Sequence, residues 1–291
     1  MTSGVNLKKF DSRKSFGSIF FVFLLVSIFV SIISLSVLLI DIFAKGLPWL
    51  DLQFINSFPS RFPEQAGIKA AFYGTIWVAT FTALISFPLG VSAAIYLEEY
   101  APDNLLTKLI TINITNLSGI PSIVYGLLGI GILVEFLSLG ISILAGAITL
   151  SLLILPVIII VSRESISAVP KSYRFASYAL GATRWQTVRH AILPPAFPGI
   201  LTGTILALSR AIGEAAPMVA IAALVYLTFI PSSPLDRFTV LPIQIYSWTT
   251  LPNPSFRGLA AAGIIVLLVL LLTMNSIAIF IRNKYQRRVV E

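Results

Sequence analysis

The stretch ALSRAIGEAAPMVAIAALVY, residues 207–226, places two charged side chains, Arg210 and Glu214, inside an otherwise apolar run. On a helix, residues four apart share one face, but arginine before glutamate is the weaker order for an intrahelical ion pair. A guanidinium group is planar, permanently charged, and able to hold two oxygens of an oxyanion at once. The pair therefore either fastens this helix to a neighbouring helix or subunit, or it serves an anion pathway. In the second case Glu214 neutralises Arg210 in the empty pore, or holds a cation of a partner subunit in register.

A second candidate for chemistry is the segment SGIPSIVYG, residues 118–126. Its glycines and Pro121 predict a kinked helix. Ser118, Ser122 and Tyr125 are candidate hydroxyls facing a substrate pathway, although small residues here also suit close helix packing.

Catalytic and metal-binding sets are missing from the sequence. It has no cysteine and one histidine, His190, which excludes disulfides, thiolate metal sites and a histidine cluster. We find no nucleophile–base pair and no glycine-rich phosphate loop. We therefore expect neither an enzyme nor a cofactor, and no hydrolysis of ATP by this chain.

The elements that position these residues are membrane spans. The 291 residues are 57% hydrophobic and 11% charged, whereas a soluble domain carries about 25% charged residues. A helix needs about 20 apolar residues to cross a bilayer. Six stretches qualify and predict an all-α integral membrane protein: about 19–43, 70–97, 112–136, 140–161, 199–229 and 258–281.

The distribution of lysine and arginine predicts the orientation of the spans. If both termini are inside, fourteen of the 20 basic residues fall on inside segments, five fall outside, and Arg210 lies within a span. Because inside loops are enriched in positive charge, we expect a multi-pass protein of the plasma (inner) membrane of a prokaryote, with both termini cytoplasmic. Residues 1–18 would form a cytoplasmic tail and 19–291 the membrane domain. The basic balance then reflects lipid headgroups rather than nucleic acid.

The predicted cytoplasmic loop at 162–198 has internal order. Arg174–Leu180 and Thr183–Ile192 each read as a short amphipathic helix, with a break at Gly181. Leu193 and Pro194, followed by a second proline, are expected to stop the second helix before the fifth span. The loop is either a connector at the membrane surface or a docking element for a soluble motor.

This loop resembles that of the ABC importer permeases, whose pattern is Glu-Ala-Ala, three residues, Gly, nine residues, Ile, one residue, Leu-Pro. The matching positions are Ala176, Gly181, Leu193 and Pro194, and Ser177 replaces the second alanine. Phe175 stands where the glutamate usually is, and Ala191 where the isoleucine usually is. In the family this loop forms the coupling helix, so the resemblance assigns ATPase coupling to Ala176, Ser177, Gly181, Ala182, Leu193 and Pro194.

The segments 118–136 and 207–224, together with IYLEEYAP at 95–102, resemble the phosphate-transport permeases of the PstA/PstC type, most closely the PstA side. The resemblance implies a six-helix type I ABC importer permease that passes inorganic phosphate by alternating access. It also implies a second, PstC-like permease, a PstB-like dimer that binds the ATP, and a PstS-like phosphate-binding protein outside. The alternatives are a permease for another oxyanion, such as sulfate or molybdate, and a secondary transporter that needs no ATPase.

Overall fold

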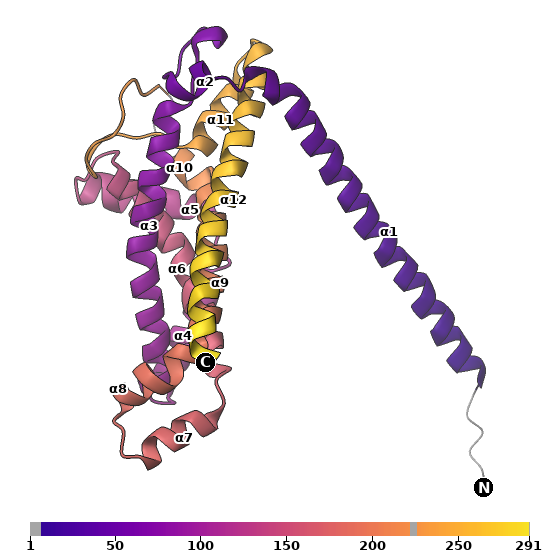
Figure 1. Ribbon diagram of the computed structural model, residues 1–291, viewed down its shortest axis with the longest axis vertical. Coiled ribbons are helices and arrows are strands. Elements are labelled where there is room, and N and C mark those ends of the chain that lie inside the picture. The colour runs from indigo at the N-terminus through magenta and orange to yellow at the C-terminus, as the bar shows by residue number, and fades with distance from the viewer. Residues whose placement is uncertain (1–6, 222–225, 291) are drawn as a thin grey trace.

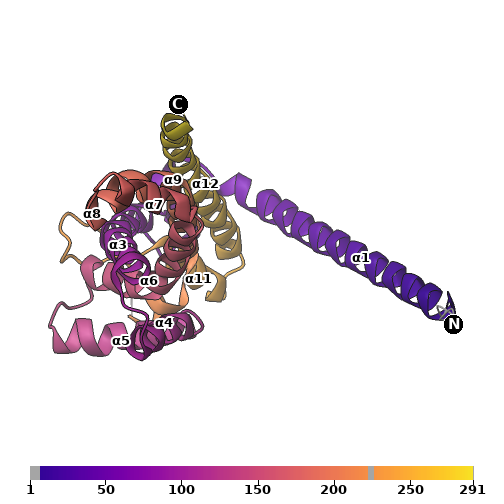
Figure 2. The same cartoon turned by 90° about the horizontal axis from the view of Figure 1, so that it is seen from below.

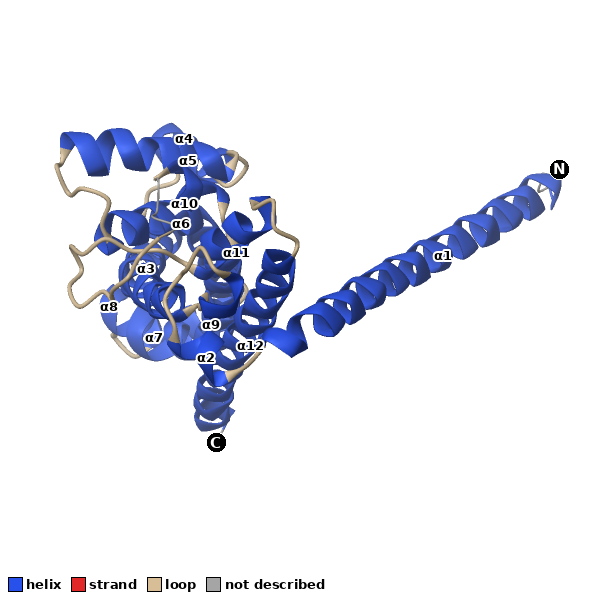
Figure 3. Ribbon diagram, turned by 90° about the horizontal axis from the view of Figure 1, so that it is seen from above, coloured by secondary structure: helices blue, strands red, loops and turns tan. Residues whose placement is uncertain are grey.

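The computed structural model describes the backbone of residues 7–221 and 226–290, and the side chains of residues 20–221 and 226–284. Every regular element in these ranges is helical, with no strand among them (Figures 1 and 3). Five of the helices are long and apolar enough to cross a membrane, and a sharply bent pair makes a sixth span if it is counted as one. The prediction of an all-α membrane fold with six spans is therefore confirmed.

The helices follow one another with short connections. Those that cross or enter the bundle are α1 (Leu7–Gly46), α3 (Lys69–Ile95), α4 (Leu105–Leu117), α5 (Ser122–Leu128), α6 (Ile143–Ser167), α9 (Leu193–Gly213), α10 (Ala216–Ala220) and α12 (Ser255–Val290). The shorter peripheral helices are α2 (Leu52–Asn56), α7 (Lys171–Ala179), α8 (Arg184–Thr187) and α11 (Leu241–Thr250). Two 3₁₀ turns and three π turns complete the order, namely η1 (Leu47–Trp49), η2 (Pro63–Gln65), η3 (Tyr96–Tyr100), η4 (Gly129–Phe136) and η5 (Val188–Ile192).

Helix α6 is the centre of the bundle. Ser142 caps its first turn by accepting a hydrogen bond from the backbone N–H of Ala145 at 3.2 Å. Its buried face packs between α3 and α9, and the Thr82 hydroxyl of α3 donates to the Ala147 carbonyl of α6 at 3.3 Å. Ser151 returns a hydrogen bond from α6 to the Thr82 carbonyl. Because lipid offers helices no hydrophobic drive to associate, such close packing and polar contacts hold membrane helices together.

Helix α1 differs from the other spans because it leaves the bundle (Figures 1 and 2). It touches α12 near Gly46, where an added Cβ would lie 2.8 Å from the backbone of Ala261 and Ala262. From Phe20 to Gly46, only Gly46 is buried. The helix begins at Leu7, well before the predicted start of the span at 19, because its hydrogen-bonded backbone continues beyond the apolar part. The first six residues of the predicted tail lie outside the described range.

The predicted third span, 112–136, is two helices rather than one. The axes of Leu105–Leu117 and Ser122–Phe136 differ by 105°. Pro121 has no N–H to donate to the Leu117 carbonyl four residues earlier, so the helix cannot continue through it. The kink that the sequence predicts is therefore present, and it is large enough to turn the chain sideways (Figure 1).

Two opposite ends of the bundle carry different structures. Helices α7 and α8 cap one end, and the first described turn of α1 lies toward that same end (Figure 1). Phe54, Trp248 and Phe256 form a separate core at the other end, with the first two rings 5.9 Å apart. In the loop nearby, the backbone N–H groups of Ser232 and Ser233 donate to the Asp236 carboxylate and hold its pKa below the ordinary value.

Candidate functional site

Helix α9 ends at Gly213, so the charged residues Arg210 and Glu214 lie at a helix terminus. The predicted fifth span, 199–229, is therefore not one helix: Glu214 is extended, with φ −78° and ψ 112°, and the short helix α10 follows. Pro217 supplies the physical reason, because it lacks the N–H that would bond the Gly213 carbonyl. Residues 222–225 of that predicted span lie outside the described range.

Arg210 and Glu214 form an ion pair across this helix end. The Arg210 Nε lies 3.4 Å from the Glu214 Oε1. The arginine side chain is 58% exposed, whereas the glutamate side chain is 22% exposed and borders a small void with Val78 and Met218. Among the described residues, only Glu214 pairs with Arg210, and it does so through Nε. The two terminal amino groups of the guanidinium make no hydrogen bond or ion pair with another described residue.

The two interrupted helices meet each other directly. A Cβ added to Gly126 of α5 would lie 2.6 Å from the Ala220 Cβ and 2.7 Å from the Pro217 carbonyl of α10. Tyr125 is buried in the same core as Met218. The structure thus joins 118–136 to 207–221, the two segments that sequence resemblance singled out separately.

None of the three hydroxyls predicted to face the pathway is bonded to Arg210 among the described residues, and two of them bond nearby backbone carbonyls. Tyr125 donates to the Leu117 carbonyl at 2.8 Å, the carbonyl that Pro121 leaves without its helical partner. Ser118 donates to the Thr115 carbonyl at 2.6 Å. Ser122 begins α5 and is half-buried. No hydrogen bond joins any of the three to Arg210 in the described part of the chain.

The loop at the other candidate site contains two short helices, as the sequence predicts. Helix α7 ends in a Schellman motif, in which the N–H of Ala182 bonds the Ser177 carbonyl and that of Gly181 bonds the Tyr178 carbonyl. Gly181 has φ +79°, a left-handed conformation that glycine adopts without strain. Thr183 and Gln186 then form a capping box that starts α8.

This turn presents apolar side chains to the outside. Phe175 is 67% exposed and Leu180 is 89% exposed, and Trp185 of α8 is also exposed. Ala176 and Ser177 lie on α7, and the Ser177 hydroxyl is 2.9 Å from that of Thr187. Such a protruding apolar knob suits insertion into a groove of another protein.

Leu193 and Pro194 do not stop the second helix, contrary to the sequence prediction. The chain from Arg184 to Gly213 is helical over 30 residues. The π turn η5 comes before them, and the helix continues from η5 into α9 although Pro194 donates no backbone hydrogen bond. The loop helix that begins at Arg184 and the helix end that carries Arg210 therefore belong to one continuous helix.

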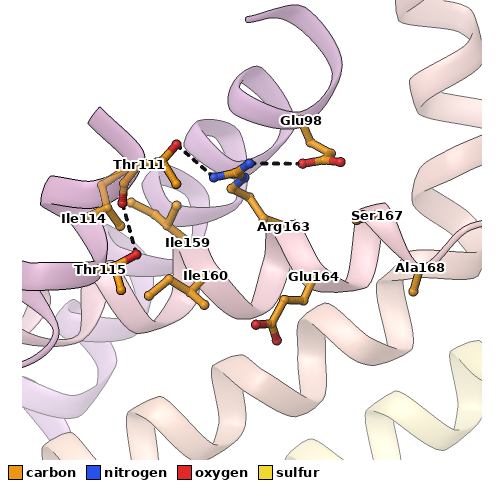
Figure 4. A pocket seen from close by; sticks show the side chains of 10 residues that line it. All are labelled: Glu98, Thr111, Ile114, Thr115, Ile159, Ile160, Arg163, Glu164, Ser167 and Ala168. Atoms are coloured by element: carbon orange, nitrogen blue, oxygen red, sulfur yellow. Dashed lines mark hydrogen bonds and ion pairs between the residues drawn. The ribbon is translucent and has the colours of Figure 1, made fainter. Parts of the chain in front are cut away.

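A cluster of ion pairs near α7 was missed by reasoning from sequence. Arg163 of α6 reaches the Glu98 carboxylate at 3.4 Å and the Thr111 hydroxyl at 3.1 Å (Figure 4). Together with Glu164, these residues line a cavity of about 470 Å³ (Figure 4). Arg174 of α7 makes a closer pair with Glu99, at 2.6 Å. The one available signal was the adjacent glutamates of LEEY at the end of a span.

Comparison with known proteins identifies relatives over most of the chain. Residues 86–289 match the family model described as binding-protein-dependent transport system inner membrane component. The chain is 35% identical to the probable ABC transporter permease protein YqgI of Bacillus subtilis, over 81% of this chain and 85% of that protein. It is 33% identical to the phosphate transport system permease protein PstA 1 of Mycobacterium tuberculosis, over 95% and 91%.

Among solved structures, the fold is similar to a chain of a bacterial ABC transporter involved in the import of the acidic polysaccharide alginate. The TM-score is 0.65 at 17% sequence identity, with 96% of this chain and 99% of that chain covered. At this identity, the likeness concerns the arrangement of helices alone.

Proposed function

This chain belongs to the family of binding-protein-dependent transport system inner membrane components, and on that premise we propose that it translocates inorganic phosphate. The chain is a membrane permease subunit of an ABC importer. Phosphate is supported as its substrate by the similarity, at about a third identity, to phosphate transport system permease proteins.

The observation that carries the phosphate proposal is the free end of the Arg210 guanidinium. Its Nε is held by Glu214 at 3.4 Å, the side chain is 58% exposed, and its two terminal amino groups make no bond to another described residue. Two parallel N–H donors match two oxygens of a tetrahedral oxyanion. In the empty pore, Glu214 neutralises the arginine and fixes its direction. A carboxylate standing alone would repel phosphate, so we assign Glu214 this pairing role.

The broken helices give this arginine its setting. Between α9 and α10 the backbone is not helical, and this break carries the charged side chain of Glu214. Membrane proteins tolerate non-helical backbone at membrane depth only where it lines a cavity or is buried in protein. The segment before α5 is broken in the same way and packs against α10 through Gly126. We therefore place the anion path beside the contact between these two interrupted spans.

The partners follow from the fold and the exposed knob. We infer that α7 and α8 face the cytoplasm, with both termini, and that the apolar tip at Phe175 and Leu180 enters a groove on an ATP-hydrolysing subunit. ATP would bind to that subunit, and this chain needs no cofactor. A second, PstC-like permease completes the pore, and a phosphate-binding protein delivers the anion from outside. ATP binding would close the ATPase dimer and move the knob, and the pore would then open outward, as one step of alternating access.

Reconstitution with competing anions tests the substrate. The complex of this chain, its permease partner, the ATPase and the binding protein is placed in vesicles, and ATP-dependent uptake of labelled phosphate is measured. We expect excess unlabelled phosphate to abolish the labelled uptake, and excess sulfate or molybdate to leave it unchanged. Uptake of labelled sulfate or molybdate in preference to phosphate would refute the phosphate assignment while leaving the permease role intact.

A further inference from the structure

Helix α7 is attached to the bundle mainly by one arginine. No residue between Lys171 and Ala179 is buried, so packing alone does not hold the helix in place. Arg174 provides the attachment instead. Its Nη2 lies 2.6 Å from the Glu99 Oε1, and its Nε lies 3.1 Å from the same oxygen.

The same guanidinium also holds the end of α6. Its Nη1 donates to the Val169 carbonyl at 2.8 Å, and its Nη2 donates to the Ile166 carbonyl at 3.1 Å. Arg174 is 17% exposed and Glu99 is 7% exposed, so water screens the pair little. The planar fork of arginine can make these contacts together, whereas a lysine ammonium cannot.

Glu99 connects this cluster to a span. It lies on the π turn η3, which continues α3 without a break. A displacement of α7 therefore acts on α3 through a carboxylate, on α6 through the Ile166 carbonyl, and on the link between α6 and α7 through the Val169 carbonyl. The neighbouring Glu98 pairs with Arg163 of α6 and makes no ion pair with α7. The two adjacent glutamates thus pair with different helices: Glu98 with α6 through Arg163, and Glu99 with α7 through Arg174.

We propose that the Glu99–Arg174 pair is the link through which movement of α7 is transmitted to α3 and α6. This inference rests on the proposed function, because it assumes that the ATPase moves α7. The two residues are positioning residues that never touch the transported anion. Removing either one leaves α7 able to bind its partner through Phe175 and Leu180, while less of its displacement reaches α3 and α6.

The test measures coupling rather than transport alone. Glu99→Gln, Arg174→Gln and the double variant are assembled with the other subunits in vesicles. Phosphate moved per ATP hydrolysed and co-purification of the ATPase are recorded for each. Asp103→Asn is the matched control, because its carboxylate is 88% exposed and pairs with Lys108 at 3.5 Å.

We expect each single variant to retain the ATPase and hydrolyse ATP, with the phosphate-to-ATP ratio lowered about fivefold or more, a typical scale for coupling between sites. The double variant should be no worse than the worse single variant, because both remove one interaction. The control should keep the wild-type ratio. Arg174→Lys, which keeps the charge but loses the fork, should fall between wild type and Arg174→Gln and replaces the latter if that variant does not assemble.

An assembled Glu99→Gln or Arg174→Lys complex with the wild-type ratio would overturn the proposal, even if its melting temperature fell. Losses that multiply in the double variant would also overturn it, since they would mean that the two residues act independently. Failure of the proposed function looks different, because the wild-type complex itself would then move no phosphate on ATP hydrolysis.

Discussion

At the scale of single residues, the site depends on which atoms remain available after local bonds are satisfied. The Arg210 guanidinium uses one nitrogen for Glu214, and its other two make no bond to another described residue. The Tyr125 hydroxyl, which sequence reasoning offered to the pathway, is instead used to satisfy the Leu117 carbonyl. Both residues stand beside a proline-induced break. Residue type alone therefore indicated where chemistry is possible, and the hydrogen-bond partners decide which group is free to perform it.

Replacing Arg210 by glutamine should abolish phosphate uptake without loss of the complex. The variant removes the charge and the paired donors, and charged hydrogen bonds contribute about 1.5–3 kcal/mol each, so loss of both should lower uptake by a factor of about 100 to 10,000. Vesicle uptake and subunit co-purification are the measurements. Arg61→Gln, which removes a charge from the exposed loop at the other end, should transport normally. Wild-type uptake by an assembled Arg210→Gln complex would remove Arg210 from the pathway.

Replacing Tyr125 by phenylalanine should affect stability more than transport. The change deletes one hydrogen bond to the Leu117 carbonyl, which keeps its bond from the Ile120 N–H. A loss of about 1 kcal/mol is expected for one such bond. The melting temperature of the purified complex should fall while uptake persists. Tyr246→Phe, at an exposed tyrosine, should change neither quantity, and loss of uptake without loss of stability would restore Tyr125 to the pathway.

At the scale of elements, two interrupted helices and one loop decide what the molecule can do. Their interruptions arise where Pro121 and Pro217 deprive an earlier carbonyl of its donor. The two breaks are then brought together by the close contact of α5 with α10. The loop of α7 and α8 depends on a different device, a left-handed glycine that reverses the chain.

Enlarging Gly126 should separate these helices. An added Cβ would lie within 2.6–2.8 Å of Ala220 and Pro217, and overpacking of this kind costs about 1–3 kcal/mol. Gly126→Val should therefore lower both the melting temperature and the uptake rate. Gly131→Val is the matched control, because a Cβ there meets nothing within 4 Å. Equal behaviour of the two variants would show that the α5–α10 contact tolerates expansion.

Enlarging Gly181 should uncouple ATP hydrolysis from transport. A valine at φ +79° is strained, by about 1–2 kcal/mol, and would disturb the Schellman turn that presents Leu180. Asparagine tolerates this conformation better. We expect Gly181→Val to weaken ATPase binding or coupling and Gly181→Asn to retain both. Since nothing lies within 4 Å of an added Cβ, undiminished co-purification with normal coupling in Gly181→Val would refute the role of this turn.

How much of this could be predicted from sequence follows from the range of each interaction. Hydropathy and proline positions are local, so the spans, the kink at Pro121 and the two loop helices could be predicted. The Glu99–Arg174 pair joins residues far apart in the chain, and no local pattern indicates which arginine a glutamate meets. The continuation of the helix through Pro194 was also missed, because it depends on the π turn before it.

At the scale of the whole molecule, the chain is a helical bundle from which α1 projects away and at one end of which α7 and α8 are exposed (Figure 1). Helix α1 exposes nearly all of its described side chains, and the knob on α7 and α8 exposes more apolar surface. Several buried serine and threonine hydroxyls inside the bundle bond a carbonyl four residues earlier on their own helix. Such a molecule offers surfaces for other proteins and lipid, and the described residues hold no group of three or more metal-ligand side chains.

If this chain depends on a partner subunit for ATP hydrolysis, as proposed, removing the ATPase should stop the accumulation of phosphate against its gradient. Vesicles containing this chain and its permease partner without the ATPase should show no accumulation of phosphate against a gradient, whereas the full complex supplied with ATP should accumulate it. Tracer content inside and outside the vesicles is the measurement. Uphill accumulation without the ATPase, driven by a proton or ion gradient, would instead identify a secondary transporter.

The unbroken helix from Arg184 to Gly213 has a mechanical consequence. At 1.5 Å per residue, its 30 residues extend about 45 Å. If this run turns as one body, a tilt of about 3° at its base carries its far end sideways by about 2 Å. That travel is comparable to the margin between forming and breaking a hydrogen bond. On the proposal that Arg210 binds the transported anion, a small tilt at the base of this helix is enough to move the Arg210 donors into or out of hydrogen-bonding distance of that anion.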